Sequence, residues 1–248
     1  MTKRVALVTG GNGGIGSAIC RELAARGNLV VAGYFPPEKE SAEAWQQQMA
    51  DQGVSIELAA RDVSSYEDSE RAVNEVAEKF GPVEILVNCA GITRDGTLKK
   101  MPEGNWKAVM ATNLDSAFNT TRHVINGMLE KGWGRIVNIA SVNGQRGQFG
   151  QANYSAAKAG MHGFTMAVAL ETAAKGITVN TVSPGYITTP MTEAMPEKVL
   201  EAIVNSVPMR RMGKPEEIAN TVAWLASEEN AYTTGANIPV NGGLFTSH

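Results

Sequence analysis

The chain has 248 residues and a formal net charge of −3, with 43% hydrophobic and 19% charged residues. This composition is typical of a globular protein with a sizeable core, and one α/β domain spanning 1–248 is the simplest division. There is no basic cluster, which argues against a nucleic-acid partner, and no apolar run approaches the roughly 18 residues of a membrane span. Cys20 and Cys89 lie in apolar contexts, so we expect free thiols and a cytoplasmic location. The three histidines lack metal-ligand spacing, so we predict no metal site.

Short apolar runs alternate with amphipathic segments along the whole chain. The runs predict strands at 4–8, 29–32, 55–60, 84–88, 135–139, 178–182 and 237–240. The intervening patterns predict a helix after residue 16 and further helices at 38–52, 66–80, 102–131, 153–175 and 215–226. Strands separated by helices pair in parallel through right-handed crossovers. We therefore predict an α/β fold with a doubly wound parallel sheet of about seven strands and helices on both faces.

The first strand runs directly into the glycine-rich segment Thr9-Gly-Gly-Asn-Gly-Gly-Ile-Gly16, and a helical pattern follows. Glycines in this context let the backbone approach a pyrophosphate, whose charge a helix N-terminus favours. We interpret the segment as a dinucleotide-binding turn, with a tight turn that binds no ligand as the alternative. Ligands in such sheets lie beyond the carboxyl ends of the strands, where Asp62, 88–91, Ser141 and Pro184-Gly185 also fall.

A second group of candidate residues follows the fifth strand. Tyr154 and Lys158 are four positions apart, which places them on one face of a helix. A nearby ammonium favours a phenolate, so we expect Lys158 to lower the pKa of Tyr154 from its usual value of about 10. The Ser141 hydroxyl can then hold the oxygen that receives the Tyr154 proton. A solvated Tyr/Lys pair is the alternative, because this spacing alone is a weak signal.

Six motifs in order resemble those of the short-chain dehydrogenase/reductase family over essentially the whole chain: Thr9-Gly10-x-x-x-Gly14-x-Gly16, Asn88-x-Ala90-Gly91, Asn113, Ser141, Tyr154-x-x-x-Lys158 and Pro184-Gly185. Cys89, where Asn is common, is a small departure. The resemblance implies a Rossmann fold and an NAD(P)H site formed by Gly10, Asn12, Gly13, Gly14, Ile15, Gly16, Tyr34, Lys39, Asp62, Val63, Asn88, Ala90, Gly91, Tyr154, Lys158, Pro184, Gly185, Ile187 and Thr189.

The resemblance also implies a mechanism. Tyr154 would donate a proton to a substrate carbonyl as hydride arrives, while Ser141 holds the carbonyl oxygen. Lys158 would bind the nicotinamide ribose, and Asn113 would hold a water that links Lys158 to solvent. Asp62 would contact the adenine and Asn88 the ribose on the adenine side.

The choice of coenzyme depends on the segment that follows the second predicted strand. An acidic residue there binds the 2′-hydroxyl of NAD, whereas a basic residue receives the 2′-phosphate of NADP. The segment 33–40 contains no Arg, and Glu38 and Glu40 flank Lys39. We therefore expect NADH to be favoured; NADPH is the alternative if Lys39 turns inward.

Within the family, four segments resemble the acetoacetyl-CoA reductases of polyhydroxybutyrate synthesis: 91–95, 132–139, 142–151 and 182–186. This implies reduction of acetoacetyl-CoA to (R)-3-hydroxybutyryl-CoA, with the substrate contacted by Asp95, Ser141, Gln148, Phe149, Gln151, Tyr154 and Tyr186. The alternatives are a 3-oxoacyl-[acyl-carrier-protein] reductase, an alcohol or sugar dehydrogenase, and a non-catalytic nucleotide-binding interaction protein.

Two expectations concern the outer parts of the molecule. The segment 187–212 contains Pro190, Pro196 and Pro208, and we interpret it as an irregular lid over the substrate. The resemblance implies a homotetramer. The apolar residues of the 153–175 helix that lie beyond its core stripe agree with this, although burial within the subunit is the alternative.

Overall fold

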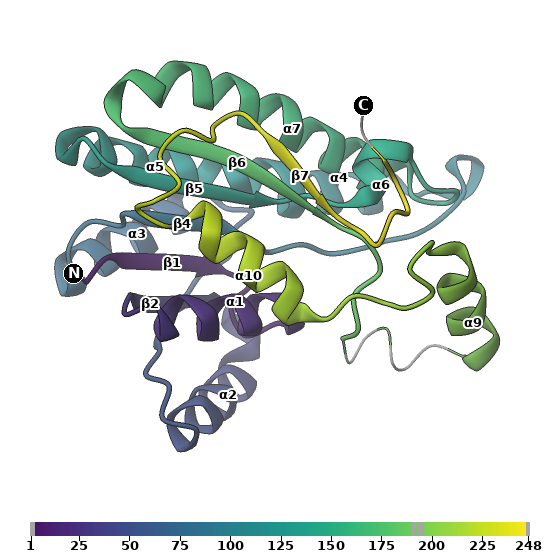
Figure 1. Ribbon diagram of the computed structural model, residues 1–248, viewed down its shortest axis with the longest axis horizontal. Coiled ribbons are helices and arrows are strands. Elements are labelled where there is room, and N and C mark those ends of the chain that lie inside the picture. Colours follow the sequence, from purple (N-terminus) through teal and green to yellow (C-terminus); the bar gives the residue numbers. More distant parts are fainter. Residues whose placement is uncertain (1–2, 190–191, 193–195, 247–248) are drawn as a thin grey trace.

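Seven parallel strands form one sheet in the order β3-β2-β1-β4-β5-β6-β7 (Figure 1). The structure is a computed structural model that describes residues 3–189, 192 and 196–246. The number of strands and their parallel pairing confirm the predicted doubly wound sheet. The strands are β1 (Val5–Thr9), β2 (Leu29–Tyr34), β3 (Glu57–Ala60), β4 (Ile85–Asn88), β5 (Gly134–Ile139), β6 (Ile177–Pro184) and β7 (Asn237–Val240).

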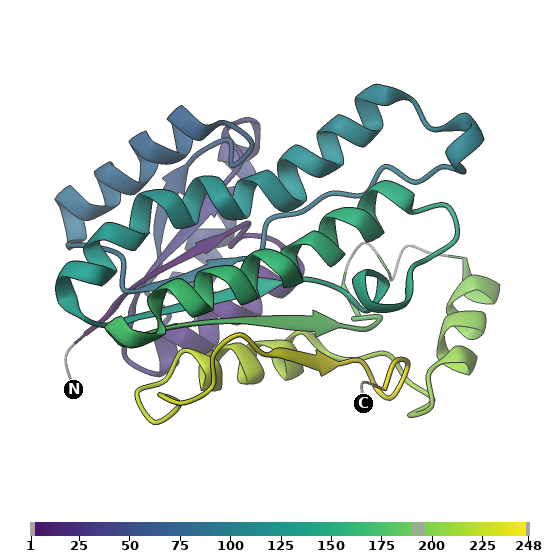
Figure 2. The same ribbon diagram turned by 90° about the horizontal axis from the view of Figure 1, so that it is seen from above.

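Helices cover both faces of the sheet, as Figures 1 and 2 show. One buried cluster joins the sheet to α1, α2 and α10, and a second joins the other face to α3, α5 and α7. Their bounds, with those of α4, α6 and α9, are α1 (Gly14–Ala25), α2 (Lys39–Asp51), α3 (Tyr66–Phe80), α4 (Glu103–Met110), α5 (Ser116–Lys131), α6 (Val142–Arg146), α7 (Ala152–Thr172), α9 (Glu197–Ser206) and α10 (Pro215–Leu225). Among the described residues, no helix is long and apolar enough to cross a membrane.

Three segments differ from the predicted elements. The helix predicted at 102–131 begins at Glu103 and contains a π-helical segment, Ala111–Asp115, that separates α4 from α5. The five-residue helix α6 was not predicted, because so short a segment shows no hydrophobic period. The lid predicted as irregular contains the helix α9, so that part of the prediction is wrong. Pro190 itself lies outside the described residues.

A row of buried polar side chains crosses the sheet near the carboxyl ends of β4, β5 and β6. The Asn88 amide donates to Asn138 Oδ1 at 2.8 Å and to Thr121 of α5 at 3.3 Å. Asn138 in turn donates to Thr165 of α7 at 2.8 Å, and Thr181 donates to the same Thr165 hydroxyl. Because buried polar groups are costly when unpaired, this row fixes the positions of α5 and α7 on the sheet.

Candidate active site

The turn between β1 and α1 has the geometry of an anion-binding site. Gly10 has φ of +63°, and a Cβ on Gly16 would lie 2.1 Å from the Gly10 carbonyl oxygen, so both positions require glycine. Helix α1 begins at Gly14, after Gly13, which has no side chain to cap the first turn. The backbone N–H groups of that turn are therefore available to an anion, and a dinucleotide pyrophosphate fits this site.

The adenosine end of the predicted coenzyme site lies at the carboxyl ends of β2 and β3. The Asn12 amide donates to the Glu38 carboxylate at 3.3 Å, which places Glu38 beside the glycine turn. Lys39, the predicted coenzyme contact, pairs with Glu43 on the exposed side of α2 at 3.7 Å. Asp62 accepts hydrogen bonds from the backbone and hydroxyl of Ser64, so its carboxylate is held in place at this edge.

The residues after β4 connect the adenosine end to the catalytic side. The Thr9 hydroxyl accepts hydrogen bonds from the backbone N–H groups of Cys89 and Ala90, both at 2.9 Å. A Cβ on Gly91 would lie 3.6 Å from Lys158 Nζ, so the chain passes close to that ammonium. The Asn88 side chain is buried and donates to the polar row described above, and its predicted contact with the ribose stays a prediction.

Asn113 lies in the π-helical segment and is fully buried. Its side chain accepts a hydrogen bond from the Ile92 N–H at 2.8 Å and donates to the Ile92 carbonyl at 2.9 Å. Both ends of the amide therefore hold the loop after β4. Single-turn π segments in helices are frequent at functional sites, and here the segment brings Asn113 against that loop.

Ser141 and Lys158 come from two helices that pack backbone to backbone. Ser141 is the N-cap of α6, and its hydroxyl accepts the Asn143 N–H at 3.1 Å. A Cβ on Gly144 would lie 2.7 Å from the Lys158 carbonyl carbon, so glycine allows α6 to rest directly on α7. This packing fixes the separation between the serine hydroxyl and the lysine.

Tyr154 and Lys158 lie one turn apart on α7, as predicted, with Lys158 Nζ 5.8 Å from the centroid of the Tyr154 ring. Burial raises the pKa of Tyr154, and the adjacent Ser141 hydroxyl lowers it in part. Burial lowers the pKa of Lys158 to about 8, and its ammonium donates to the Ile139 carbonyl at 2.7 Å. Within the chain itself, burial thus outweighs the lowering of the Tyr154 pKa expected from Lys158. At neutral pH the phenol is protonated and can act as an acid.

The predicted substrate residues that follow β4 and β5 lie beside one another. The Gln151 amide donates to Asp95 at 2.9 Å and accepts from Asn143 at 3.0 Å, so it ties these two loops together. Gln148 is exposed, and Phe149 is 88% exposed and offers an apolar surface to a ligand. Asp95, Gln151 and Phe149 are therefore near one another, whereas Gln148 makes no contact that fixes its side chain in the described part of the chain.

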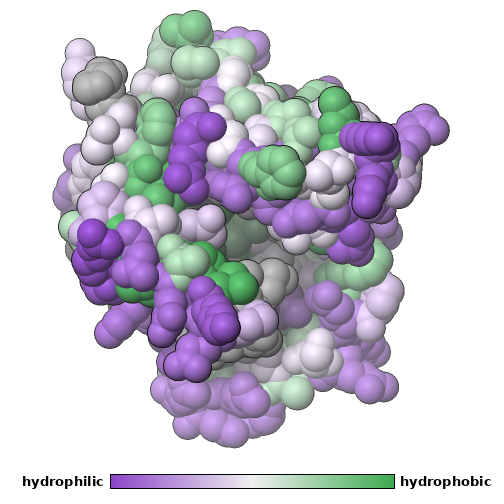
Figure 3. Space-filling view, turned by 90° about the vertical axis from the view of Figure 1, so that its right-hand side faces the viewer, coloured by the Kyte–Doolittle hydropathy of each residue, from purple (hydrophilic) through white to green (hydrophobic). Residues whose placement is uncertain are grey.

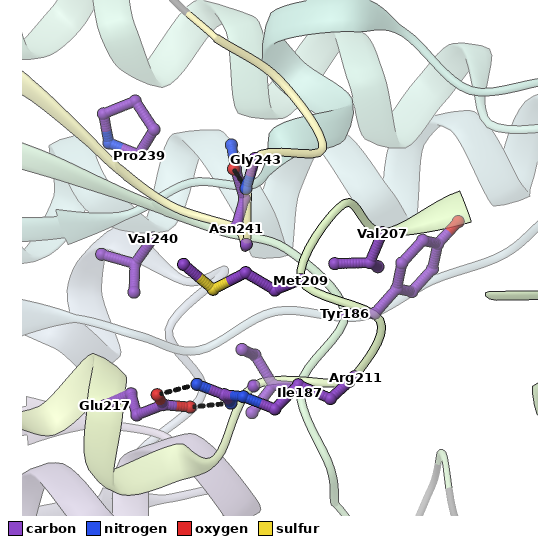
Figure 4. A pocket seen from close by; sticks show the side chains of 12 residues that line it. Tyr186, Ile187, Val207, Met209, Arg211, Glu217, Pro239, Val240, Asn241 and Gly243 are labelled. Atoms are coloured by element: carbon purple, nitrogen blue, oxygen red, sulfur yellow. Dashed lines mark hydrogen bonds and ion pairs between the residues drawn. The ribbon is translucent and has the colours of Figure 1, made fainter. Parts of the chain in front are cut away.

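Two of the predicted residues after β6, Tyr186 and Ile187, line a separate cavity. The carboxyl edge of the sheet faces the viewer in Figure 3, where the surface is hollowed near its centre. A cavity of about 330 Å³ lies on this side, lined by residues that include Tyr186, Ile187, Val207 and Met209 (Figure 4). Ser141, Tyr154 and Lys158 are not among its lining residues, so the cavity lies beside the catalytic group and not around it.

Backbone contacts hold the chain after β6. The Gly185 N–H donates to Val240 and the Gly213 N–H to Tyr186, both at 2.9 Å, and the Thr189 N–H donates to the Thr192 hydroxyl at 2.8 Å. Pro184 ends β6. These contacts bring the predicted residues of this segment to the same edge as the glycine turn.

Sequence reasoning missed two polar residues of the site, Asn143 and Asn153, and named Glu38 only as a neighbour of Lys39. Asn143 links Ser141 to Gln151, and Glu38 accepts a hydrogen bond from Asn12. Asn153 accepts the Tyr154 N–H at 2.8 Å and donates to the Arg94 carbonyl at 3.0 Å. Its position immediately before Tyr154 at the start of a helix is a signal that could have found it. No cluster of three or more His, Cys, Asp or Glu side chains suited to a metal ion occurs among the described residues.

Comparison with known proteins agrees with this geometry. Residues 10–245 match the profile of a family described as enoyl-(acyl carrier protein) reductase. The chain is 61% identical to acetoacetyl-CoA reductase of Allochromatium vinosum over 98% of both chains. It is 53% identical to acetoacetyl-CoA reductase of Cupriavidus necator, over 98% of this chain and 99% of that one. It is 46% identical to a 3-oxoacyl-[acyl-carrier-protein] reductase of Vibrio cholerae, over 98% and 97%. Because this similarity covers the whole sheet and the residues at its carboxyl edge, the chain belongs to the short-chain dehydrogenase/reductase family.

Proposed function

We propose that this chain is an NAD(P)H-dependent ketoreductase that reduces acetoacetyl-CoA to (R)-3-hydroxybutyryl-CoA. The observation that carries the reaction class is the protonated Tyr154 phenol beside Ser141, one helical turn from the Lys158 ammonium. The substrate is supported by the two acetoacetyl-CoA reductases, which are more similar to this chain than the acyl-carrier-protein reductase is. The exposed Phe149 offers an apolar surface that suits a short acyl chain.

In this mechanism, the chain's residues donate the proton and stabilise the negative charge that develops on the carbonyl oxygen. When bound, the nicotinamide supplies the hydride that forms the new C–H bond at the carbonyl carbon. Tyr154 gives its phenolic proton to the carbonyl oxygen, where negative charge develops, and Ser141 donates a hydrogen bond to the same oxygen. The Lys158 ammonium stabilises the phenolate that remains, and a proton from solvent restores the phenol. The products are the 3-hydroxyacyl thioester and the oxidised coenzyme.

For the coenzyme, we propose that NADH is preferred. Glu38 follows β2 and accepts a hydrogen bond from Asn12 of the glycine turn, and an acidic side chain near the end of the second strand can accept a hydrogen bond from the 2′-hydroxyl of NAD. The same carboxylate repels a 2′-phosphate. Lys39, the basic residue that would favour NADPH, is paired with Glu43.

The test is the oxidation of NADH and of NADPH, followed in parallel with acetoacetyl-CoA and with acetoacetyl-acyl-carrier protein. We expect kcat/KM to be highest for acetoacetyl-CoA with NADH. Faster turnover of the carrier-protein substrate would replace the proposed substrate. A kcat/KM that favours NADPH would overturn only the coenzyme preference.

We further propose that the segment 187–212 is a lid on a single domain. All described residues of α9 are at least partly exposed. The two ends of the segment are paired with each other through the backbone bridge between Ile187 and Gly213. An exposed helix between two fixed ends can close over a substrate and exclude water. We expect hydrogen exchange in 197–206 to slow when coenzyme and substrate both bind, and unchanged exchange would contradict this role.

For assembly and location, we propose a cytoplasmic homotetramer. Phe118, Met166 and Trp224 are each close to half-exposed, and such apolar side chains on helices suit a subunit interface. Both cysteines are free thiols, which agrees with a reducing compartment. Sedimentation of the purified protein measures the assembly directly.

A further inference from the structure

Arg61 lies directly after β3 and crosses beneath the end of β2. Its backbone N–H donates to the Tyr34 carbonyl at 2.9 Å, which continues the pairing of the two strands. A Cβ on Gly33 would lie 3.2 Å from Arg61 Nε, so the absence of a side chain at Gly33 makes room for the arginine. The guanidinium is therefore held against the last residues of β2.

Among the described residues, no hydrogen bond or ion pair balances the charge of Arg61. The side chain is 1% exposed, and in the described part of the molecule its three nitrogens are buried without a hydrogen-bond partner. Burial lowers its pKa to about 10, with a partial opposing effect from Asp68, so the group stays charged at neutral pH. Asp68 itself is bonded to Arg71 and to the Asp62 N–H. Because a buried unpaired cation is costly, an anion close to it is strongly favoured.

This cation lies at the coenzyme edge. The Gly33 carbonyl accepts the Gly11 N–H at 2.9 Å, so Gly33 is bonded directly to the glycine turn. Glu38 lies on the Asn12 side of the same turn. The carboxyl ends of β2 and β3 thus carry two opposed charges, Glu38 exposed at the surface and Arg61 buried beneath Gly33.

We propose that Arg61 is a determinant of coenzyme choice, whose buried positive charge favours a phosphate on the adenosine ribose and so opposes Glu38. The two coenzymes differ only in that 2′-phosphate. Arg61 acts on the 2′-phosphate through the electrostatic field of its buried charge and not by direct contact, because charges interact strongly where water is excluded. The enzyme therefore retains NADPH as a second coenzyme beside the preferred NADH. This inference rests on the proposed coenzyme site but not on the identity of the carbonyl substrate.

The experiment measures the binding of adenosine 2′,5′-bisphosphate and of AMP by calorimetry, without any carbonyl substrate. For Arg61→Gln we expect bisphosphate affinity to fall about tenfold while AMP affinity changes less than about twofold. Glu38→Gln should have the opposite effect and raise bisphosphate affinity. The matched control is Arg71→Gln, which removes the same charge from an exposed side chain that is paired with Asp68 and Glu75.

Several outcomes would overturn the proposal. Equal losses for both ligands would mean that Arg61 only supports the fold. If bisphosphate affinity did not fall in Arg61→Gln, or fell equally in Arg71→Gln, the position of Arg61 beneath Gly33 would have no effect on coenzyme choice. If the Gln variant does not fold, Arg61→Met, which fills the same space with an apolar chain, is measured in its place. Arg61→Lys must keep the wild-type ratio of bisphosphate affinity to AMP affinity. If neither ligand bound the wild type, the coenzyme site itself, and with it the proposed function, would fail.

Discussion

Tyr154→Phe should reduce kcat for ketone reduction by roughly 10²–10⁴-fold, the range that a general acid contributes. The substitution removes only the hydroxyl, so the ring keeps its place on α7 one turn from Lys158. Without the phenolic proton, the oxygen that gains negative charge has only Ser141 as a donor from this group. The measurement is single-turnover oxidation of NADH, which isolates the chemical step from product release.

The matched control for this prediction is Tyr232→Phe. Tyr232 is fully exposed at the surface, so loss of its hydroxyl should leave kcat unchanged. Coenzyme affinity of Tyr154→Phe should remain within about threefold of the wild type, because the loss falls on the transition state. If kcat of Tyr154→Phe stayed within tenfold of the wild type, another residue would have to be the acid.

Lys158 should produce a pH dependence with opposite signs for activity and stability. Burial lowers the Lys158 pKa from 10.5 to about 8, so the ammonium loses its proton as pH rises through about 8. We expect kcat/KM to fall there, because this parameter reports the ionisations of the free enzyme. Between about pH 8 and 10.5 the unfolded chain binds more protons at this position than the folded chain does, so the free energy of unfolding should rise with pH.

Two variants isolate this effect. Lys158→Arg keeps a positive charge at every accessible pH, so its kcat/KM, although lower, should not decline near pH 8. Lys158→Met should lose roughly 10²-fold or more in kcat/KM and should lack the pH-dependent gain in stability. The measurements are pH profiles of kcat/KM and of thermal unfolding. A wild-type decline near pH 8 that persisted in Lys158→Arg would assign the ionisation to another group.

Much of the architecture could be predicted because the hydrophobic pattern determines where the strands and helices lie along the chain. The alternation of apolar runs and amphipathic segments predicted all seven strands to within a few residues. Parallel pairing then requires the carboxyl ends to share one edge, and the motifs at Gly10, Ser141 and Pro184 lie there. Local spacing was also sufficient to place Tyr154 and Lys158 on one face of α7.

The remaining features depend on contacts between distant segments. The π-helical segment around Asn113 is invisible in the sequence because one extra residue in a turn hardly changes the hydrophobic period. The pairing of Lys39 with Glu43 is known only from the structure. Asn88 was assigned by its motif, whereas the direction of its side chain is decided by partners on β5 and α5. The approach of Arg61 to Gly33 arises only when β3 pairs with β2.

Because α6 packs directly on α7 at Gly144, substitutions that alter acyl-chain preference can occur without altering the geometry of the reactive group. Main-chain atoms set the distance from Ser141 to Lys158, so the reactive group is insulated from substitutions in the neighbouring loop. Phe149 lies in that loop, exposed and outside the packed interface. Acyl-chain preference can therefore drift, or be engineered, through residues 147–150 while the proton donor stays in register.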